Sequence, residues 1–250
     1  MKRIFFIWLF IASGFMFNTT NAQVKNIVLV HGAFADGAGW EKVFTILKAR
    51  GYNVSIVGNP DTGIEEDVAA TNRVLDRQKG PVILVGHSYG GAIITMAGTS
   101  AKVVGLVYVA AFSPDKGETL GKLSSSYPAD PVNGILPAKD GFLWYDLTKF
   151  HAGFCADLPK KEADFMAAAQ VPVAVSGFTY VFSDIAWKTK PSWYIVATED
   201  HSLQPDLERF MARRANGKVT EIKSSHVVFI SHAKEVADII EAAAMGAVAK

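Results

Sequence analysis

Short apolar segments alternate with amphipathic helical segments along most of this 250-residue chain. Apolar segments with the composition of buried β-strands lie at residues 24–30, 52–57, 81–85, 103–109, 192–198 and 218–223. Apolar residues recur at helical spacing in residues 39–50, 64–79, 89–100, 205–215 and 233–244. Such alternation is typical of an α/β protein with a mostly parallel, twisted sheet and helices on both faces.

The alternation stops over residues 112–190, where no strong strand pattern occurs. This segment is rich in proline and aromatic residues, and its clearest helical pattern lies at residues 160–169. Long insertions between the strands of a compact domain are usually functional. We therefore expect a helical cap over the carboxyl edge of the sheet, inserted before the strand at residues 192–198. Most of its aromatic rings would form the cap's own core, whereas a minority, with Phe112 and Trp144 as candidates, would line a substrate pocket.

The N-terminus has the pattern of an export signal. Lys2 and Arg3 are followed by an almost wholly apolar run over residues 4–17 and then by small and polar residues up to Ala22. The apolar run is shorter than the roughly 20 residues that span a bilayer, which disfavours the alternative of a membrane anchor. The pattern predicts a signal peptide over residues 1–22, cleaved after Ala22, and export to the periplasm or the medium. The remaining chain would be a single domain that is not held at a membrane.

Charge and cysteine content argue against several classes of partner and site. The chain has 25 Lys and Arg against 24 Asp and Glu, whereas nucleic-acid-binding surfaces need a clustered excess of basic residues. Cys155 is the single cysteine, so an internal disulfide and Cys-rich zinc or iron–sulfur sites are excluded. We expect a small-molecule substrate as the partner, bound without a metal ion or an organic cofactor.

The segment Gly86-His87-Ser88-Tyr89-Gly90 matches the pattern G-x-S-x-G, which is weak by itself. Here an apolar strand comes directly before it, and a helix of small residues begins directly after it. A strand-to-helix turn this tight forces the serine into a strained backbone conformation, and the flanking glycines avoid clashes with the neighbouring backbone. This context predicts a nucleophile elbow that presents the Ser88 hydroxyl at the sheet edge. The alternative is an ordinary glycine-rich turn.

A nucleophilic serine needs a general base and an acid that orients the base. His226 closely follows the last predicted strand, at the same sheet edge as Ser88, and comes late in the chain, as the order serine, acid, histidine requires. His232 is the less favoured alternative and fits a surface or capping position. Either Glu199 or Asp200, at the end of the preceding strand, could supply the acid. We favour Asp200, because the shorter side chain is usual at this place.

The loop His31-Gly32-Ala33-Phe34 follows the first strand at the same edge. In a nucleophile elbow, the N–H after the nucleophile, here that of Tyr89, pairs with an N–H of this loop to stabilise an oxyanion. Ala33 is the predicted loop donor. Gly32 would let the backbone approach the substrate, and Phe34 is a further candidate for the substrate pocket. His31 is expected to brace the loop through hydrogen bonds.

Several segments together resemble the α/β-hydrolase family, and the resemblance covers nearly all of residues 23–250. The segments are HGAFADGAGW from His31, GHSYGG from Gly86, YVAAFSPDKGE from Tyr108, YIVATEDHSLQPDLERF from Tyr194 and SSHVVFIS from Ser224. Within the family the chain is most similar to the small-capped branch that holds plant methylesterases, hydroxynitrile lyases and many bacterial esterases. The resemblance implies the α/β-hydrolase fold, a triad of Ser88, Asp200 and His226, and an oxyanion hole formed by the N–H groups of Ala33 and Tyr89.

Two positions favour ester hydrolysis over cyanohydrin cleavage. Hydroxynitrile lyases of this branch typically carry a Lys after the triad histidine and a Thr after the first-loop histidine, whereas Val227 and Gly32 stand here. We therefore expect a secreted serine carboxylesterase that cleaves small or medium apolar or aromatic esters through an acyl-enzyme. The alternatives are a lactonase, perhydrolase, or C–C or cyanohydrin lyase with the same triad, and a non-catalytic ligand-binding protein of the same fold.

Overall fold

The computed structural model describes residues 23–247, which contain a six-stranded parallel sheet. Its strands are β1 (Asn26–Val30), β2 (Asn53–Val57), β3 (Val82–His87), β4 (Val103–Val109), β7 (Ser192–Ala197) and β8 (Lys218–Ile222). They lie in the order β2-β1-β3-β4-β7-β8, which confirms the predicted parallel α/β sheet. The predicted signal peptide, residues 1–22, lies outside the described residues.

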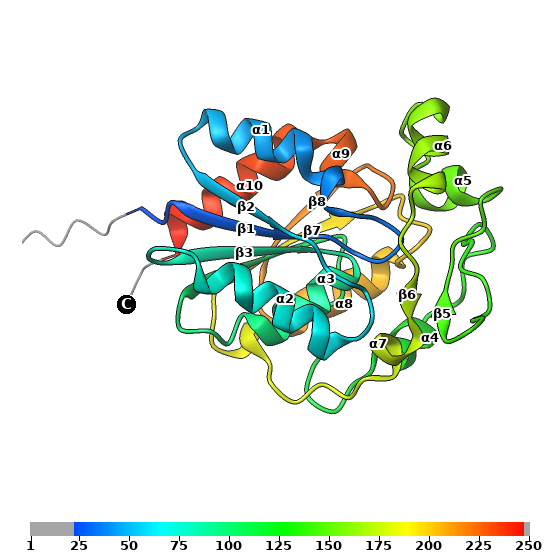
Figure 1. Cartoon of the computed structure of the whole chain (residues 1–250), viewed down its shortest axis with the longest axis horizontal. Coiled ribbons are helices and arrows are strands. Elements are labelled where there is room, and N and C mark those ends of the chain that lie inside the picture. Colours follow the sequence, from blue (N-terminus) through cyan, green and yellow to red (C-terminus); the bar gives the residue numbers. More distant parts are fainter. Residues whose placement is uncertain (1–22, 248–250) are drawn as a thin grey trace, which may run out of the picture.

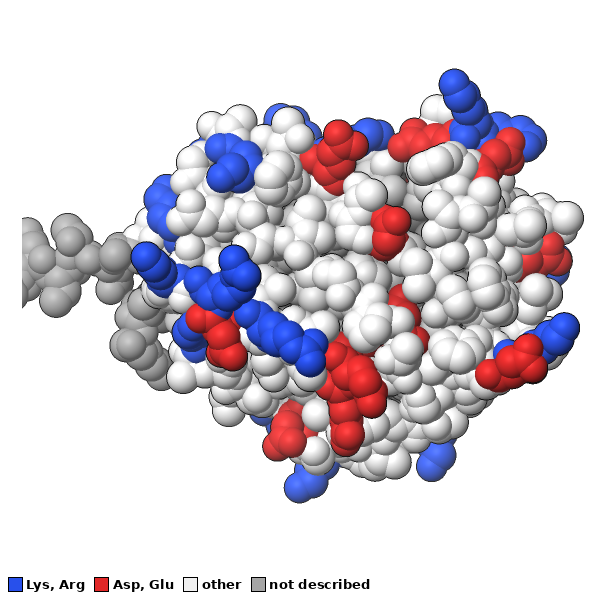
Figure 2. Space-filling model, in the orientation of Figure 1, with Lys and Arg blue, Asp and Glu red and all other residues white. Residues whose placement is uncertain are grey.

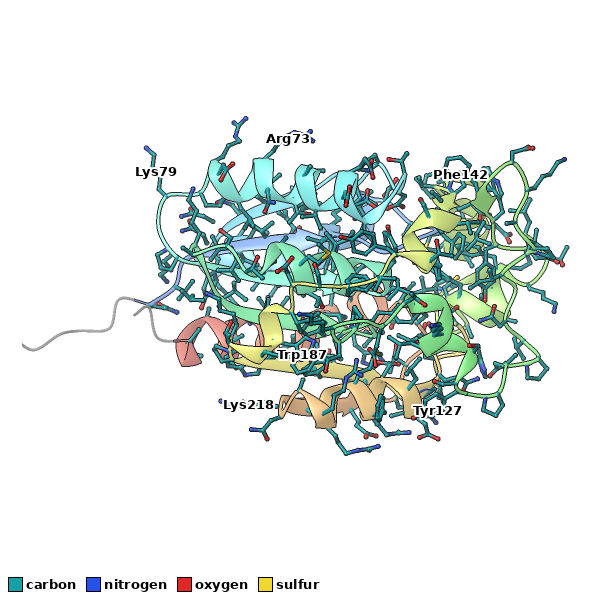
Figure 3. All side chains as sticks on the ribbon, turned by 90° about the horizontal axis from the view of Figure 1, so that it is seen from below. Arg73, Lys79, Tyr127, Phe142, Trp187 and Lys218 are labelled. Carbon is teal, nitrogen blue, oxygen red and sulfur yellow. The ribbon has the colours of Figure 1, made fainter. Side chains whose placement is uncertain are left out.

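Helices cover both faces of the sheet, as predicted (Figure 1). One face carries η1 (Gly37–Trp40), α1 (Glu41–Ala49), α9 (Val228–Ser231) and α10 (Ala233–Gly246). The other face, seen from below in Figure 3, carries α2 (Ile64–Asp76), α3 (Tyr89–Ala97) and α8 (Pro205–Arg214). The helices bury an apolar stripe with helical spacing, as Val43 and Leu47 do in α1 and Leu207 and Met211 do in α8.

The strands run in register, which brings their carboxyl ends to one edge of the sheet. Val30 at the end of β1 pairs with Gly86 near the end of β3, and Ala197 pairs with Ile222 at the ends of β7 and β8. β1, β3 and β7 are buried along their whole length. The loops that follow these strands therefore start from rigid anchors and open at the same edge.

Residues 112–190, the cap segment, connect β4 to β7. The segment contains α4 (Leu120–Ser125), β5 (Phe142–Leu143), α5 (Phe150–Phe154), α6 (Lys160–Ala168), β6 (Val173–Ala174), α7 (Val175–Thr179) and η2 (Ala186–Lys188). All of these except η2 lie over the carboxyl edge of the sheet, at the right in Figure 1. Figure 3 likewise places Phe142 at the opposite end of the molecule from Lys79, which precedes β3.

The cap segment differs from the sequence-based expectation in one respect. β5 and β6 pair as a two-stranded antiparallel sheet, whereas the sequence predicted helical pieces without a strong strand. Each strand has only two residues, which is too short to produce a recognisable alternation of apolar and polar side chains. Only the pairing in space reveals this small sheet.

The cap segment has an aromatic core of its own. Tyr145, Phe150 and Phe154 are buried, and the Tyr145 ring packs edge-to-face at 5.4 Å from Phe150 and 5.5 Å from Phe154. Phe34, from the loop after β1, packs edge-to-face on Tyr145 at 5.6 Å. The core of the cap segment is therefore continuous with the loop that follows the first strand.

Charged side chains of both signs are interspersed on the face shown in Figure 2, with uncharged areas between them. Several of them pair between elements. Arg50, after α1, binds Asp238 at 2.6 Å and Glu241 at 2.9 Å, both on α10. No helix within residues 23–247 is long and apolar enough to cross a membrane.

Candidate active site

Ser88 lies on the turn between β3 and α3. Its backbone has φ 52° and ψ −121°, a left-handed conformation that is strained for a residue with a Cβ. Its N–H donates to the carbonyl of Val109 at 3.2 Å, and its carbonyl accepts from the N–H groups of Gly91 at 2.9 Å and Phe112 at 3.1 Å. These bonds hold the strained turn in place, and they point the serine at the carboxyl edge of the sheet, before the first turn of α3.

Two glycines allow this turn to pack closely. An ideal Cβ on Gly86 would lie 2.5 Å from the carbonyl oxygen of Gly90 and 2.9 Å from the amide nitrogen of Gly91. A Cβ on Gly32 would lie 2.7 Å from the Cβ of Ser88. Real Cβ atoms do not approach other atoms this closely. Glycine at position 86 therefore lets the end of β3 meet the start of α3 within the turn, and glycine at position 32 lets the loop after β1 meet the turn.

Replacing Gly86 with alanine is expected to destabilise the protein by about 1–3 kcal/mol, because the added methyl group meets backbone atoms that cannot rotate away. This corresponds to a fall in the thermal unfolding midpoint of roughly 2–12 °C. Thermal unfolding followed by circular dichroism measures it. Gly58→Ala is the matched control, since a Cβ there would meet nothing within 4 Å. An unchanged midpoint for Gly86→Ala would contradict the close packing described for this turn.

The structure joins Ser88, His226 and Asp200 by hydrogen bonds. The Nε2 atom of His226 lies 2.8 Å from the Ser88 hydroxyl, and its Nδ1 lies 2.5 Å from Oδ2 of Asp200. The other carboxylate oxygen of Asp200 accepts from the N–H groups of Ser202 at 2.7 Å and Leu203 at 2.8 Å. Because a carboxylate accepts, Nδ1 carries the proton, and Nε2 is free to accept a proton from Ser88.

Glu199 and His232, the alternatives for the acid and the base, lie outside this group. Glu199 is exposed and pairs with Lys223 at 3.4 Å. His232 has Glu235, one turn along α10, as its partner at 3.4 Å. The structure thus brings Asp200 and His226 to Ser88 and gives Glu199 and His232 partners elsewhere.

His31 braces the loop after β1 as a neutral side chain. Its Nε2 accepts the N–H of Asn59 at 3.0 Å, so Nδ1 carries the proton and donates to the carbonyl of Gly32 at 3.0 Å. The Asn59 side chain in turn donates to the His31 carbonyl at 3.0 Å. Burial lowers the pKa of His31, which favours the neutral ring that these bonds require. These hydrogen bonds are how His31 braces the loop, the role that the sequence predicts for it.

His87 supports the histidine loop from the sheet side. Its Nε2 donates to the backbone carbonyl of His226 at 3.0 Å, and its ring packs on Phe229 at 4.4 Å. Burial lowers its pKa well below the usual value, so the ring is neutral. From the sequence, His87 is only a member of the elbow, because a variable position of G-x-S-x-G carries no signal about what its side chain contacts.

The two residues predicted to donate to an oxyanion lie in the Ser88 turn and in the loop that packs against it. Within residues 23–247, the N–H groups of Ala33 and Tyr89 have no hydrogen-bond acceptor. The Tyr89 side chain points away from the turn, and its hydroxyl donates to Asp67 at 2.9 Å. Phe34, with φ 60°, fastens the loop to the cap segment by donating its N–H to Val171 at 3.1 Å. Both amides are therefore held by fixed backbone and available to a ligand.

The candidates for the substrate pocket divide into two groups. Gly32 and Phe112 contact the Ser88 turn, and Phe34 follows in the same loop as Gly32. Trp144 is 43% exposed and lines a separate hollow of the cap segment, which no triad residue lines. The structure does not bring Trp144 to the site, because sequence composition placed it in an aromatic segment without showing which face it occupies.

A cleft of about 280 Å³ lies between α6 and the segment formed by η1 and α1. Apolar side chains form much of its lining, among them Ala35, Phe165, Met166 and Phe229. Ala35 follows the loop of Ala33, and Phe229 lies in α9, directly after the histidine loop. No triad residue lines this cleft, but it adjoins two of the loops that build the site, and no sequence pattern predicted it.

Cys155 is buried beside this region, and burial raises the pKa of its thiol to about 12. A protonated, buried thiol is a poor nucleophile, which leaves Ser88 as the nucleophile that the geometry favours. Among residues 23–247, no group of three or more His, Cys, Asp or Glu side chains is arranged to hold a metal ion.

Known proteins resemble this chain in sequence and in fold. Residues 27–239 match the model of the alpha/beta hydrolase family. The chain belongs to this family. A pyrethroid hydrolase from Sphingobium wenxiniae is 27% identical over 87% of this chain and 86% of its own length. Putative methylesterase 19 from Arabidopsis thaliana is 27% identical over 87% of this chain and 96% of its own length.

A solved structure supports the same family assignment. The crystal structure of a pyrethroid hydrolase from Sphingobium faniae has a TM-score of 0.75 and 26% identity, over 90% of this chain and 98% of that one. These similarities confirm the predicted family and fold, and they include both a methylesterase and bacterial hydrolases, as the resemblance implied. The chain is a carboxylesterase-type hydrolase.

Proposed function

We propose that this protein hydrolyses carboxylic esters of small or medium apolar or aromatic compounds through a serine-bound acyl-enzyme. The observation that carries the proposal is the hydrogen-bonded chain from Ser88 through His226 to Asp200, which starts at a strained turn beside two available N–H groups. An ordinary glycine-rich turn would need neither the strain nor the chain of partners.

Each of these groups has a defined role in acylation. The Ser88 oxygen attacks the ester carbonyl carbon while Nε2 of His226 takes the hydroxyl proton. Asp200 holds the ring in the required tautomer and stabilises the imidazolium that forms. The N–H groups of Ala33 and Tyr89 donate to the oxyanion of the tetrahedral intermediate. When the intermediate collapses, His226 gives its proton to the departing alcohol.

Deacylation repeats these steps with water in place of the serine. His226 takes a proton from the water, whose oxygen attacks the acyl carbonyl, and the same two N–H groups stabilise the second oxyanion. Collapse releases the carboxylic acid and returns the proton to Ser88. Apart from the ester and one water molecule, every group in these steps belongs to the chain.

The surroundings of Ser88 support an apolar substrate. Phe112 adjoins the turn, Phe34 follows the loop donor, and the neighbouring cleft has Phe165, Met166 and Phe229 in its lining. Apolar pockets with a few placed polar groups bind drug-sized molecules. The names of the relatives, a pyrethroid hydrolase and a methylesterase, point to esters of that size.

Turnover of a panel of p-nitrophenyl esters, aromatic methyl esters, lactones and cyanohydrins tests this proposal. We expect hydrolysis of short p-nitrophenyl esters, and at least about a 10³-fold loss in the Ser88→Ala variant. Ser125→Ala, at an exposed position of α4, is the matched control and should keep full activity. A fluorophosphonate probe should label the wild type and fail to label Ser88→Ala.

Other results would overturn parts of the proposal. Undiminished ester turnover in Ser88→Ala would exclude the serine mechanism. Cleavage of lactones or cyanohydrins in preference to esters would assign the same triad to a different reaction. Failure of the probe to label the wild type, with no turnover of any substrate in the panel, would favour a ligand-binding protein of this fold.

We also propose that the protein is exported and that its signal peptide is removed after Ala22, on the strength of the pattern in residues 1–22. Mass spectrometry of the protein recovered from its native host measures the N-terminus. We expect a chain that begins at Gln23 in the periplasmic or extracellular fraction. A chain that retains residues 1–22 in that fraction would contradict this proposal.

A further inference from the structure

The cap segment reaches the histidine loop through one carboxylate. Asp157 lies between α5 and α6, and its Oδ2 accepts from the Ser224 hydroxyl at 2.7 Å and from the Ser225 N–H at 3.1 Å. Its Oδ1 accepts from the Ser225 hydroxyl at 2.5 Å. Asp157 is at the surface, whereas Ser224 and Ser225 are buried directly before His226. Three hydrogen bonds therefore join one cap residue to the two residues that precede His226.

The carboxylate of Asp157 is ionised when it makes these bonds. Partial burial opposes ionisation, but the hydrogen bonds from Ser225 and Ser224 outweigh that effect and lower the pKa of Asp157. Hydrogen bonds to an ionised acceptor are stronger than those between neutral groups. The contact is thus a charge-assisted clamp from the cap segment onto the histidine loop.

Within the described residues, both hydrogen-bond donors of Ser225 depend on this clamp, while its carbonyl accepts from the Ser224 hydroxyl at 3.1 Å. Its N–H and its hydroxyl have Asp157 as their only acceptor, whereas Ser224 also has Ser231 as a partner at 3.0 Å. Buried donors that lose their acceptor are costly, so the backbone at Ser225 would shift to find water or another partner if Asp157 were removed. His226 is the next residue and would move with it.

Besides its hydrogen bonds to Asp200 and Ser88, His226 is held from two other directions. His87 binds its carbonyl from the sheet side at 3.0 Å, and the Phe154 ring of α5 packs edge-to-face on its imidazole at 5.0 Å. Phe154 precedes Asp157 by three residues, so a ring and a carboxylate of the same corner of the cap segment reach the histidine loop. His87 belongs to the core, so Phe154 and Asp157 are the supports of His226 that the cap segment supplies.

We propose that Asp157 is a positioning residue that holds His226 at hydrogen-bond distance from Ser88 by clamping Ser225. The proposal rests on the proposed function for its effect on turnover. It means that the cap segment does more than cover the site, because one of its carboxylates keeps the general base in place. Misplacement of a catalytic group by about 1 Å can cost roughly 100-fold in rate, so loss of the clamp acts on kcat rather than on substrate affinity.

Steady-state kinetics on the best ester substrate test the proposal. We expect Asp157→Ala to lower kcat by about 10- to 100-fold and to leave KM within about twofold. Asp157→Asn keeps one acceptor oxygen and should restore part of the loss. Ser225→Ala, Asp157→Ala and the double variant form a cycle in which the double variant should be no slower than Asp157→Ala alone.

Asp164→Ala is the matched control, because Asp164 is an exposed acid of α6 whose partner is Lys160 at 2.7 Å. It should retain wild-type kcat. Thermal unfolding of each variant identifies the temperature at which all of them are folded, and the kinetics are measured below it. Wild-type kcat in folded Asp157→Ala would overturn the proposal, and so would a rise in KM at unchanged kcat.

A second measurement distinguishes a failure of this inference from a failure of the proposed function. The proton between Nδ1 of His226 and Asp200 gives a downfield proton NMR signal when the ring is fixed, and we expect Asp157→Ala to broaden or shift it while Asp164→Ala leaves it unchanged. This holds whether or not the protein turns over esters. If the wild type lacks esterase activity but the signal responds to Asp157→Ala, only the proposed function fails. If the esterase depends on Ser88 but neither kcat nor the signal responds, only the role of Asp157 fails.

Discussion

Replacing Asp200 with asparagine is expected to lower kcat on ester substrates by about 10⁴-fold, the loss found for the same change in serine proteases. The amide oxygen of Asn would keep the N–H donors of Ser202 and Leu203, which now bind Oδ1 of Asp200. The amide nitrogen would then face Nδ1 of His226 and donate to it. The ring proton would move to Nε2, and His226 could no longer accept the proton of Ser88.

Steady-state kinetics and the rate of fluorophosphonate labelling measure this effect. Glu199→Gln is the matched control, because Glu199 is the adjacent acid and pairs with exposed Lys223. We expect Glu199→Gln to retain activity. A large loss in Glu199→Gln together with an active Asp200→Asn would show that the wrong acid has been assigned.

The second large effect concerns Asp61, in the loop between β2 and α2. This residue is fully buried, has φ 54°, and its two carboxyl oxygens have no hydrogen-bond partner within residues 23–247. Burial, and then the charge of nearby Asp67, raise the pKa of Asp61 to about 9. Asp67 accepts the N–H of Asp61 at 2.8 Å and the hydroxyl of Tyr89 at 2.9 Å, and burial raises its pKa to about 6. Asp61 is therefore a neutral acid in the folded protein at pH 7.

This raised pKa makes stability depend on pH. In the unfolded chain Asp61 loses its proton near pH 4, about the ordinary value, whereas the folded chain keeps it up to about pH 9. Between these values the folded state binds the extra proton, so the free energy of unfolding falls as pH rises, by up to about 1.4 kcal/mol per pH unit. The contribution is complete below pH 4 and is lost above pH 9.

Asp61→Asn removes this pH dependence, and asparagine also tolerates a positive φ. We expect the variant to exceed the wild type by at least about 2 kcal/mol at pH 8, a rise of roughly 4–8 °C in the unfolding midpoint. The difference should shrink steadily as pH is lowered toward 4. Urea unfolding at several pH values measures it.

Asp76→Asn, at an exposed position at the end of α2, is the control for the loss of one negative charge. Its stability should follow the wild-type curve with pH. A difference between Asp61→Asn and the wild type that stays constant from pH 4 to pH 8 would mean that Asp61 is ionised in the folded protein, and this outcome would contradict the prediction.

Local sequence patterns were enough to predict the parallel sheet, the helices on both faces and the strained turn at Ser88. Hydrophobic periodicity indicates which side of a helix or strand is buried. The glycines of the turn indicate where two stretches of backbone pass close together. The same patterns missed β5 and β6, whose strands are too short to have a period. They also made Trp144 a candidate for the substrate pocket, whereas it lines a separate hollow of the cap segment. Composition alone carries no information about the direction in which a side chain points.

The amino-acid sequence alone settled the order of strands and helices and put Ser88, Asp200 and His226 on loops at one sheet edge, because these features depend on neighbours close in the chain. Packing in space decided which atoms meet. Ser88 and His226 are 138 positions apart, and Ser225 and Asp157, which join the core to the cap, are 68 positions apart. Contacts between residues this far apart in the sequence depend on strand register and on how the cap segment docks. No local sequence pattern encodes either of these. The partners of His87 and Asp157 and the burial of Asp61 therefore became visible only in the folded chain.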